Sequence, residues 1–212
     1  MDQTDQFMNA IRCFLFLLLV PAFHSKAQAI KTANQFEGKI TYKIEYSAKN
    51  NFDVSNFSTL YGDTAELFYS KGNFRFDFNG TETKRHVYRV DSNQRMMLVN
   101  QKGIEKTITT DLTKPVSYLV EINHGESKKL LLTQAYGNGS TSRSDFRFDS
   151  DQLMIDPSVF RRWHYNHLNT VFAFSKSLWT EHRIETDEYV IHWKAIDIKA
   201  RTIDNKLFLL KQ

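Results

Sequence analysis

Histidines are the side chains of this sequence that most readily suggest chemistry. His164 and His167 stand three residues apart, a spacing that places two imidazoles on one helix face, as in many zinc sites. A zinc site needs a third protein ligand, and neither a thiol nor a carboxylate follows at ligand spacing. We therefore expect surface or core histidines and no metal ligand, with a catalytic pair as the weaker alternative. His182 and His192 are expected to face each other across the last long hairpin.

The other signatures of catalysis are missing from the sequence. Serine is abundant, but no Gly-x-Ser-x-Gly segment places one at a nucleophile turn. The carboxylate pairs Asp149/Asp151 and Asp187/Glu188 fall in predicted turns, where solvated acids are common. The sequence contains neither a glycine-rich phosphate loop nor a strand–helix–strand alternation, and these are the patterns of a nucleotide-binding α/β enzyme. The sequence predicts a protein that is not an enzyme, with no catalytic residue and no cofactor.

Composition places the chain among globular proteins. Of its 212 residues, 41% are hydrophobic, 14% aromatic and 25% charged, which is too apolar for a disordered chain and too charged for a polytopic membrane protein. A single cysteine excludes a disulfide framework and a cysteine-based zinc site. The net charge of +4 is scattered along the chain rather than gathered in a basic stripe, so we expect no nucleic-acid partner.

The first 29 residues have the pattern of an export signal. Arg12 precedes an apolar run from Cys13 to Phe23, and Ala27-Gln28-Ala29 provides small residues before a cleavage point. The run is too short to span a membrane, which needs about 20 apolar residues, and Cys13 lacks the neighbours of a lipoprotein processing site. The pattern predicts a signal peptide over residues 1–29, a single domain over residues 30–212 without a stable membrane anchor, and a periplasmic or secreted location.

From residue 36 onward the dominant hydrophobic period is two, which is typical of strands. In the segment 36–47 the even positions hold Phe36, Ile40, Tyr42, Ile44 and Tyr46, whereas the odd positions hold polar residues. Similar runs, separated by turn residues, cover 65–78, 86–108, 116–135 and 146–148. The sequence therefore predicts a succession of antiparallel strands, each with one buried and one solvated face.

The last third of the chain is expected to contain one short helix and two hairpins. Asp156 can cap a helix that begins at Pro157 and runs to about Trp163. Residues 178–185 and 189–200 form the first hairpin, and 207–210 form the last strand. The apolar positions change phase near Lys194-Ala195, which is the mark of a β-bulge or of a strand covered on both faces.

These elements predict a mainly β protein built on a single strongly curved antiparallel sheet, an unfinished barrel with one short helix. A long sheet with one apolar face must close or curl to hide that face. Aromatic side chains dominate the face, and an ordinary core would account for them. If the concave side is not filled, the same rings would line an apolar groove. The candidate ligand-binding residues are Tyr42, Tyr46, Phe74, Phe76, Tyr88 and Trp193.

Several short segments resemble a family of uncharacterised exported β-proteins common in Bacteroidota. They are Phe36–Lys43, Leu153–Pro157, Ala195–Ile198, Ile203-Asp204 and Leu207–Leu209. The resemblance implies a LolA/LolB-like architecture, a deeply curved antiparallel sheet with a helical lid, and a role with an apolar ligand or a lipoprotein in the periplasm. The chain shows no evident helix before its first strand and little lid material, and no functional residue is carried over.

Two functions remain open from the sequence. The first is a non-enzymatic exported protein that binds a lipid, an acyl chain or a lipoprotein in the concave face of its sheet. The alternative is a structural or protein-interaction module of the cell envelope whose core is filled. The sequence leaves the oligomeric state undetermined.

Overall fold

A computed structural model describes residues 35–125 and 128–209. The expected signal peptide lies outside the described residues. Eleven antiparallel strands in this part of the chain form one sheet that is not closed into a barrel, and strands account for 54% of the structure. They are β1 (Gly38–Ala48), β2 (Thr64–Ser70), β3 (Asn73–Phe78), β4 (Thr83–Arg89), β5 (Gln94–Gln101), β6 (Ile104–Asp111), β7 (Ser117–His124), β8 (Lys129–Tyr136), β9 (Thr141–Phe148), β10 (Trp179–Thr186) and β11 (Tyr189–Ala200). The predicted fold class is confirmed.

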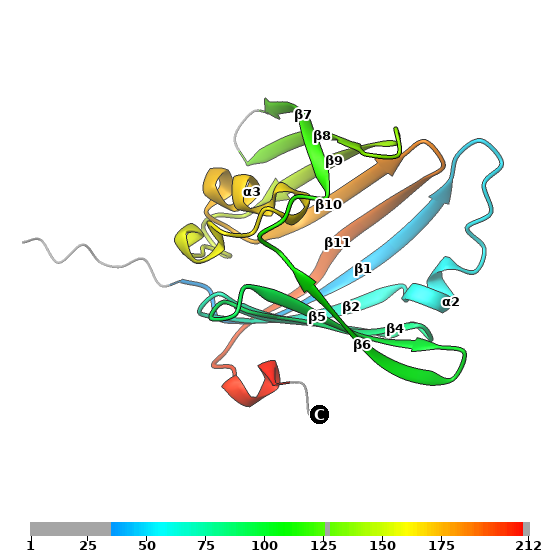
Figure 1. The fold of residues 1–212 in the computed structure, drawn as a ribbon. Coiled ribbons are helices and arrows are strands. Elements are labelled where there is room, and N and C mark those ends of the chain that lie inside the picture. Colours follow the sequence, from blue (N-terminus) through cyan, green and yellow to red (C-terminus); the bar gives the residue numbers. More distant parts are fainter. Residues whose placement is uncertain (1–34, 126–127, 210–212) are drawn as a thin grey trace, which may run out of the picture. The chain divides into compact units, whose positions relative to one another are not determined.

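The order across the sheet is β6-β5-β4-β3-β2-β1-β11-β10-β9-β8-β7, so the first and last long strands meet in the middle (Figure 1). Hairpins join most neighbours, and β6 and β7 form the two edges. The sheet curls strongly. Phe76 on β3 and Trp193 on β11 have ring centroids 5.9 Å apart, although β2 and β1 lie between their strands. In a flat sheet, strands three places apart would be separated by about 14 Å.

The central strand β1 follows the predicted alternation. Ile40, Tyr42 and Ile44 are buried on the concave side, and the residues between them are more exposed. The expected bulge is also present. Thr41 pairs with Asp197 and Tyr42 with Ala195, which leaves Ile196 as the extra residue on β11. Ile196 is 60% exposed. Because the bulge shifts the alternation of side chains by one residue, Ile198 pairs with Ile40 on the concave side.

The helices differ from those expected. Asp156 accepts a hydrogen bond from the Ser158 amide at 2.8 Å, as a cap should, but the helix is only the 3-10 segment η1 (Pro157–Phe160). A second 3-10 segment, η2 (Tyr165–His167), leads into the α-helix α3 (Leu168–Ser175), which the sequence did not predict. Left-handed conformations at Asn166 and His167, the last two residues of η2, produce a kink before α3 begins. Because α3 contains β-branched and aromatic residues of low helix propensity, packing rather than propensity stabilises it.

Two further short helices were also not predicted. The helix α2 (Phe57–Tyr61) lies between β1 and β2. The segment 207–209, expected to begin a strand, instead belongs mainly to the 3-10 helix η3 (Asn205–Phe208), whose first turn is capped by Asp204. Phe208 packs on the convex face of the sheet against Phe68 and Val87, so this face also carries a small core.

Glu37 fixes the C-terminal segment to the start of β1. Its carboxylate accepts hydrogen bonds from the Ile203 amide at 2.9 Å and from the Ser70 hydroxyl at 3.0 Å. Glu37→Ala should lower the free energy of unfolding by about 1–3 kcal/mol, because the buried Ile203 amide loses its partner. Urea denaturation measures this loss. Glu66→Ala is the matched control, since its ion pair with Lys39 is partly exposed and should contribute less than about 1 kcal/mol. Equal losses in both variants would contradict the assignment.

Candidate functional site

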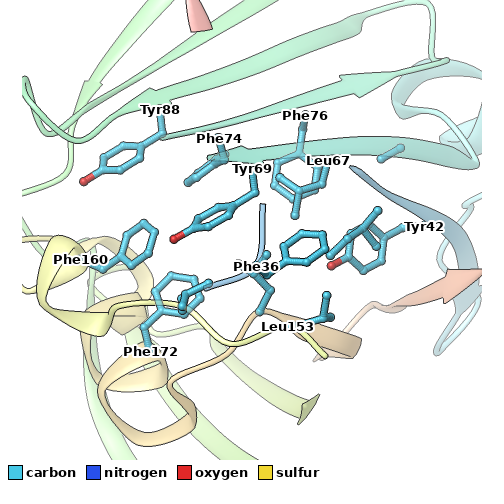
Figure 2. Close-up of a cluster of buried hydrophobic side chains, with 14 of the residues drawn as sticks. Phe36, Tyr42, Leu67, Tyr69, Phe74, Phe76, Tyr88, Leu153, Phe160 and Phe172 are labelled. Atoms are coloured by element: carbon cyan, nitrogen blue, oxygen red, sulfur yellow. The ribbon is translucent and has the colours of Figure 1, made fainter. Parts of the chain in front are cut away.

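One end of the concave side is a packed core, which we call the packed end. Phe160 and Phe172, from η1 and α3, lie against aromatic side chains of the sheet, as Figure 2 shows. The ring centroids of Phe160 and Phe172 are 4.4 Å apart, and those of Phe160 and Tyr88 are 5.8 Å apart. Four of the candidate ligand-binding residues belong to this core and are at most 8% exposed: Tyr42, Phe74, Phe76 and Tyr88.

The other end of the concave side holds a cavity of about 430 Å³, which we call the apolar cavity. The other two candidates, Tyr46 and Trp193, line it, and so does Phe76 at the border with the core. The sequence analysis did not single out the other lining residues as a site: Phe57, Tyr61, Phe78, Thr83, His86, Trp179, His182, Ile184, Tyr189 and Ile191. Of these, His86 and His182 could have been found, because each occupies a concave-side position in the period-two pattern of its strand.

The helix α2 forms part of the cavity wall, and a set of hydrogen bonds holds it there. The Tyr46 hydroxyl donates to the Gly62 carbonyl at 2.8 Å, just after the end of α2. The Asn79 amide group donates to Asp63 at 2.7 Å and accepts from the Thr64 amide at 3.1 Å. Gly62 has φ +93°, and a Cβ there would lie 2.5 Å from the Asn79 Oδ1. Only glycine allows this close approach without strain.

Aromatic contacts join α2 to the strands beside it in the cavity wall. The ring of Phe57 contacts those of Tyr46, Tyr61 and Tyr189, with centroids 5.4 to 5.6 Å apart. These edge-to-face contacts are the favourable geometry for aromatic pairs. The side of the cavity next to α2 is therefore built from tyrosine and phenylalanine rings, several of which carry hydroxyl groups.

Two histidines face the cavity from strands far apart in the sheet, His86 on β4 and His182 on β10. Burial lowers the pKa of each imidazole to about 3, with smaller contributions from the charges of Arg95 on His86 and of His192 on His182. Both side chains are therefore neutral at pH 7. Burial also raises the pKa of the Tyr46 hydroxyl to about 12, which keeps it protonated.

Two nitrogens of the cavity-lining residues lack a hydrogen-bond partner among the described residues: Trp179 Nε1 and His182 Nε2. Their rings are neighbours, with centroids 5.7 Å apart. His182 also stacks on Phe146 at 4.0 Å with an interplanar angle of 12°. Buried polar atoms in proteins are rarely left unpaired. Among the described residues of the cavity wall, Trp179 and His182 are therefore the two neighbours whose buried nitrogens have no hydrogen-bond partner.

The histidine pairs expected from the sequence do not form sites. His164 is exposed, and His167 instead places Nε2 3.0 Å from the Ser117 carbonyl oxygen. His182 pairs across the hairpin with Trp193, whereas His192 pairs with Arg183, so the two histidines lie on opposite faces of the sheet. The expectation that they face each other is wrong, because the register is offset by one residue. In the described residues, no three His, Cys, Asp or Glu side chains are placed to hold a metal ion.

Three other hollows occur in the described part of the chain, and two have larger volumes than the apolar cavity. One of about 600 Å³ lies between the β8–β9 and β10–β11 turns, and one of about 540 Å³ lies beside η3 and includes Arg75, Arg85 and Glu105. Their walls are considerably more polar or charged. Ligand sites are usually predominantly apolar with few polar groups, which favours the apolar cavity as the candidate site.

The geometry defines a class: an open, curled antiparallel sheet with helices packed at one end of its concave side and an apolar cavity at the other. No protein-family model matches this chain, and no curated protein matches its sequence. In the described residues, we find no helix with both the length and the apolar character needed to cross a membrane.

Proposed function

We propose that this protein binds an apolar ligand in the concave face of its sheet, without catalysing a reaction. The observation that carries the proposal is the apolar cavity of about 430 Å³, whose walls are aromatic and aliphatic side chains contributed by strands from both halves of the sheet. Cavities of roughly 300–1,000 Å³ with such walls are typical of small-molecule sites. Each methylene group moved from water to these walls would contribute about 0.8 kcal/mol to binding.

The proposed ligand is a lipid or acyl chain, either free or attached to a lipoprotein. The export-signal pattern of residues 1–29 supports a periplasmic or secreted location, where such ligands are handled. The LolA/LolB-like resemblance of the sequence agrees with this proposal, since it implies a curled sheet with helical material on its concave side. In this protein that helical material consists of η1, η2 and α3, which pack over one end of the concave side.

Filling the cavity tests the proposal. Ile191 lines the cavity next to Ile184, with which it pairs in the β10–β11 hairpin. Ile191→Trp should weaken the binding of N-phenyl-1-naphthylamine, an uncharged fluorescent apolar probe, by about tenfold or more, since the indole occupies the space that the probe needs. Fluorescence titration of the purified protein measures the affinity. Native mass spectrometry of gently extracted protein should also show bound lipid in the wild type and less in the variant.

The matched control is Ile196→Trp, which makes the same change on the same strand. Ile196 is 60% exposed at the bulge and does not line the cavity, so probe binding should stay unchanged. If the wild-type protein took up no probe and carried no lipid, the proposal would be wrong. Equal loss of binding in both variants would mean that the probe binds elsewhere.

A role as an interaction module of the cell envelope is the second candidate, and a separate observation favours it. The edge strand β7 and the residue before it expose three apolar side chains, Val116, Tyr118 and Val120, which are 44%, 74% and 63% exposed. Unpaired edge strands with apolar residues commonly pair with another chain. Crosslinking in cells from an engineered photoreactive residue at position 118 should capture a protein partner if this function holds.

A further inference from the structure

The polar groups of the apolar cavity allow its ligand to be specified more closely, and this step rests on the function proposed above. No lysine, arginine, aspartate or glutamate lines the cavity among the described residues. The two imidazoles that do line it, His86 and His182, are neutral at pH 7 because burial lowers their pKa to about 3. A ligand that carries a charge into this space would leave water without gaining an opposite charge, which is strongly unfavourable.

The cavity wall nevertheless contains two side chains that can form hydrogen bonds with a ligand. Trp179 Nε1 can only donate a hydrogen bond, whereas the neutral imidazole of His182 can donate from one nitrogen and accept at the other. Both Trp179 Nε1 and His182 Nε2 are buried and unpartnered in the described structure, although their rings are in contact. One hydroxyl oxygen could accept from the indole and donate to the imidazole, and a carbonyl oxygen could accept from either ring.

The surroundings of this pair hold both rings in place. Phe146 stacks on His182, and Phe172 stacks on Trp179 with centroids 5.9 Å apart and an interplanar angle of 13°. Phe172 belongs to the packed end, so the Trp179 ring lies where the cavity meets the packed end. The hydroxyl-bearing rings of Tyr61 and Tyr189 lie on the α2 side of the cavity. A ligand with a polar group at one end of an apolar chain would match this distribution.

We propose that the apolar cavity selects an uncharged single-chain amphiphile, such as a long-chain alcohol or an acyl ester, whose hydroxyl or carbonyl group hydrogen-bonds to Trp179 Nε1 and His182 Nε2. Three probes of equal chain length test this selection: 1-decanol, decanoate and decyltrimethylammonium. Each is titrated into the purified protein at neutral pH, and displacement of N-phenyl-1-naphthylamine reports its binding. The neutral alcohol should bind at least about tenfold more tightly than either charged probe.

Two variants test the hydrogen bonds themselves. His182→Phe and Trp179→Phe each retain an aromatic ring and remove the ring nitrogens that could hydrogen-bond to the ligand. Either change should weaken 1-decanol binding by about tenfold more than it weakens binding of N-phenyl-1-naphthylamine, because the naphthylamine has no hydroxyl or carbonyl group to lose its hydrogen bond. His192→Phe is the control, since that histidine lies on the other face of the sheet, where its Nε2 contacts Glu181 at 2.7 Å. If one variant fails to fold, the other and the wild-type probe series still decide the question.

The outcomes separate this inference from the proposed function. Tight binding of N-phenyl-1-naphthylamine together with equal or tighter binding of decanoate would overturn the selection of an uncharged ligand but leave an apolar-ligand site in place. A preference for 1-decanol that both phenylalanine variants retain would overturn the assignment of Trp179 and His182. Failure of every probe to bind would overturn both proposals.

Discussion

Phe160→Ala should lower the free energy of unfolding by about 3–5 kcal/mol, the usual loss when a buried phenylalanine is truncated in a packed core. Phe160 is fully buried, and its ring contacts those of Tyr88, Trp163 and Phe172. The aromatic cluster at the packed end holds η1 and α3 against the sheet. Urea denaturation followed by circular dichroism measures the loss.

Phe174→Ala provides the comparison. Phe174 lies on α3 but is 37% exposed, and its ring contacts only those of His124 and Phe148 among the described aromatic side chains. The same chemical change there should therefore cost less, about 1 kcal/mol. A loss below about 1 kcal/mol for Phe160→Ala would mean that η1 and α3 do not pack against the sheet, and that the concave side is open along its whole length.

Acidification from pH 6.5 to pH 4.5 should destabilise the protein by up to about 5 kcal/mol. The pKa of His86 and that of His182 are lowered from 6.5 to about 3 by burial, so the folded state keeps both imidazoles neutral where the unfolded chain binds protons. The unfolded state then binds more protons, and stability rises with pH across this window. Each histidine contributes about 1.4 kcal/mol per pH unit below 6.5, and stability is unaffected by them above that value.

Carboxylates with lowered pKa, such as Glu185, lose their contribution mainly below their ordinary value of 4.5, so the two histidines dominate the window above it. His182→Phe should remove about half of the pH dependence between pH 6.5 and pH 4.5. Denaturation midpoints measured at several pH values give the slopes. A wild-type stability that is flat across this window would show that the two imidazoles take up protons in the folded state as readily as in the unfolded chain.

The sequence was sufficient to predict the sheet. The period-two pattern of Phe36, Ile40, Tyr42 and Ile44 specifies a strand and its buried face, because successive side chains of a strand point to opposite sides. The phase change near Lys194-Ala195 specified the bulge at Ile196 for the same reason. The curl followed from the need to cover a long apolar face, and the antiparallel pairing followed from the short turns between neighbouring runs.

The helices and the site could not be predicted in the same way. The sequence of α3 has weak helix propensity, and the helix forms because Val171 and Phe172 are buried against β8, β9 and the aromatic cluster. Likewise, α2 has no buried residue, and its place depends on the Gly62–Asn79 contact between segments distant in sequence. Local pattern carries no information about contacts of this kind.

The period-two pattern specifies which side chains face the concave side of the sheet, whereas long-range packing controls which of them are covered. Tyr88 and His86 are two residues apart on one strand and share one face, yet Tyr88 lies under η1 in the packed end and His86 lines the cavity. Alternation fixes the face of each side chain through backbone geometry alone. Whether that side chain meets a helix or an open cavity depends on where residues 157–175 pack, and long-range contacts set that position.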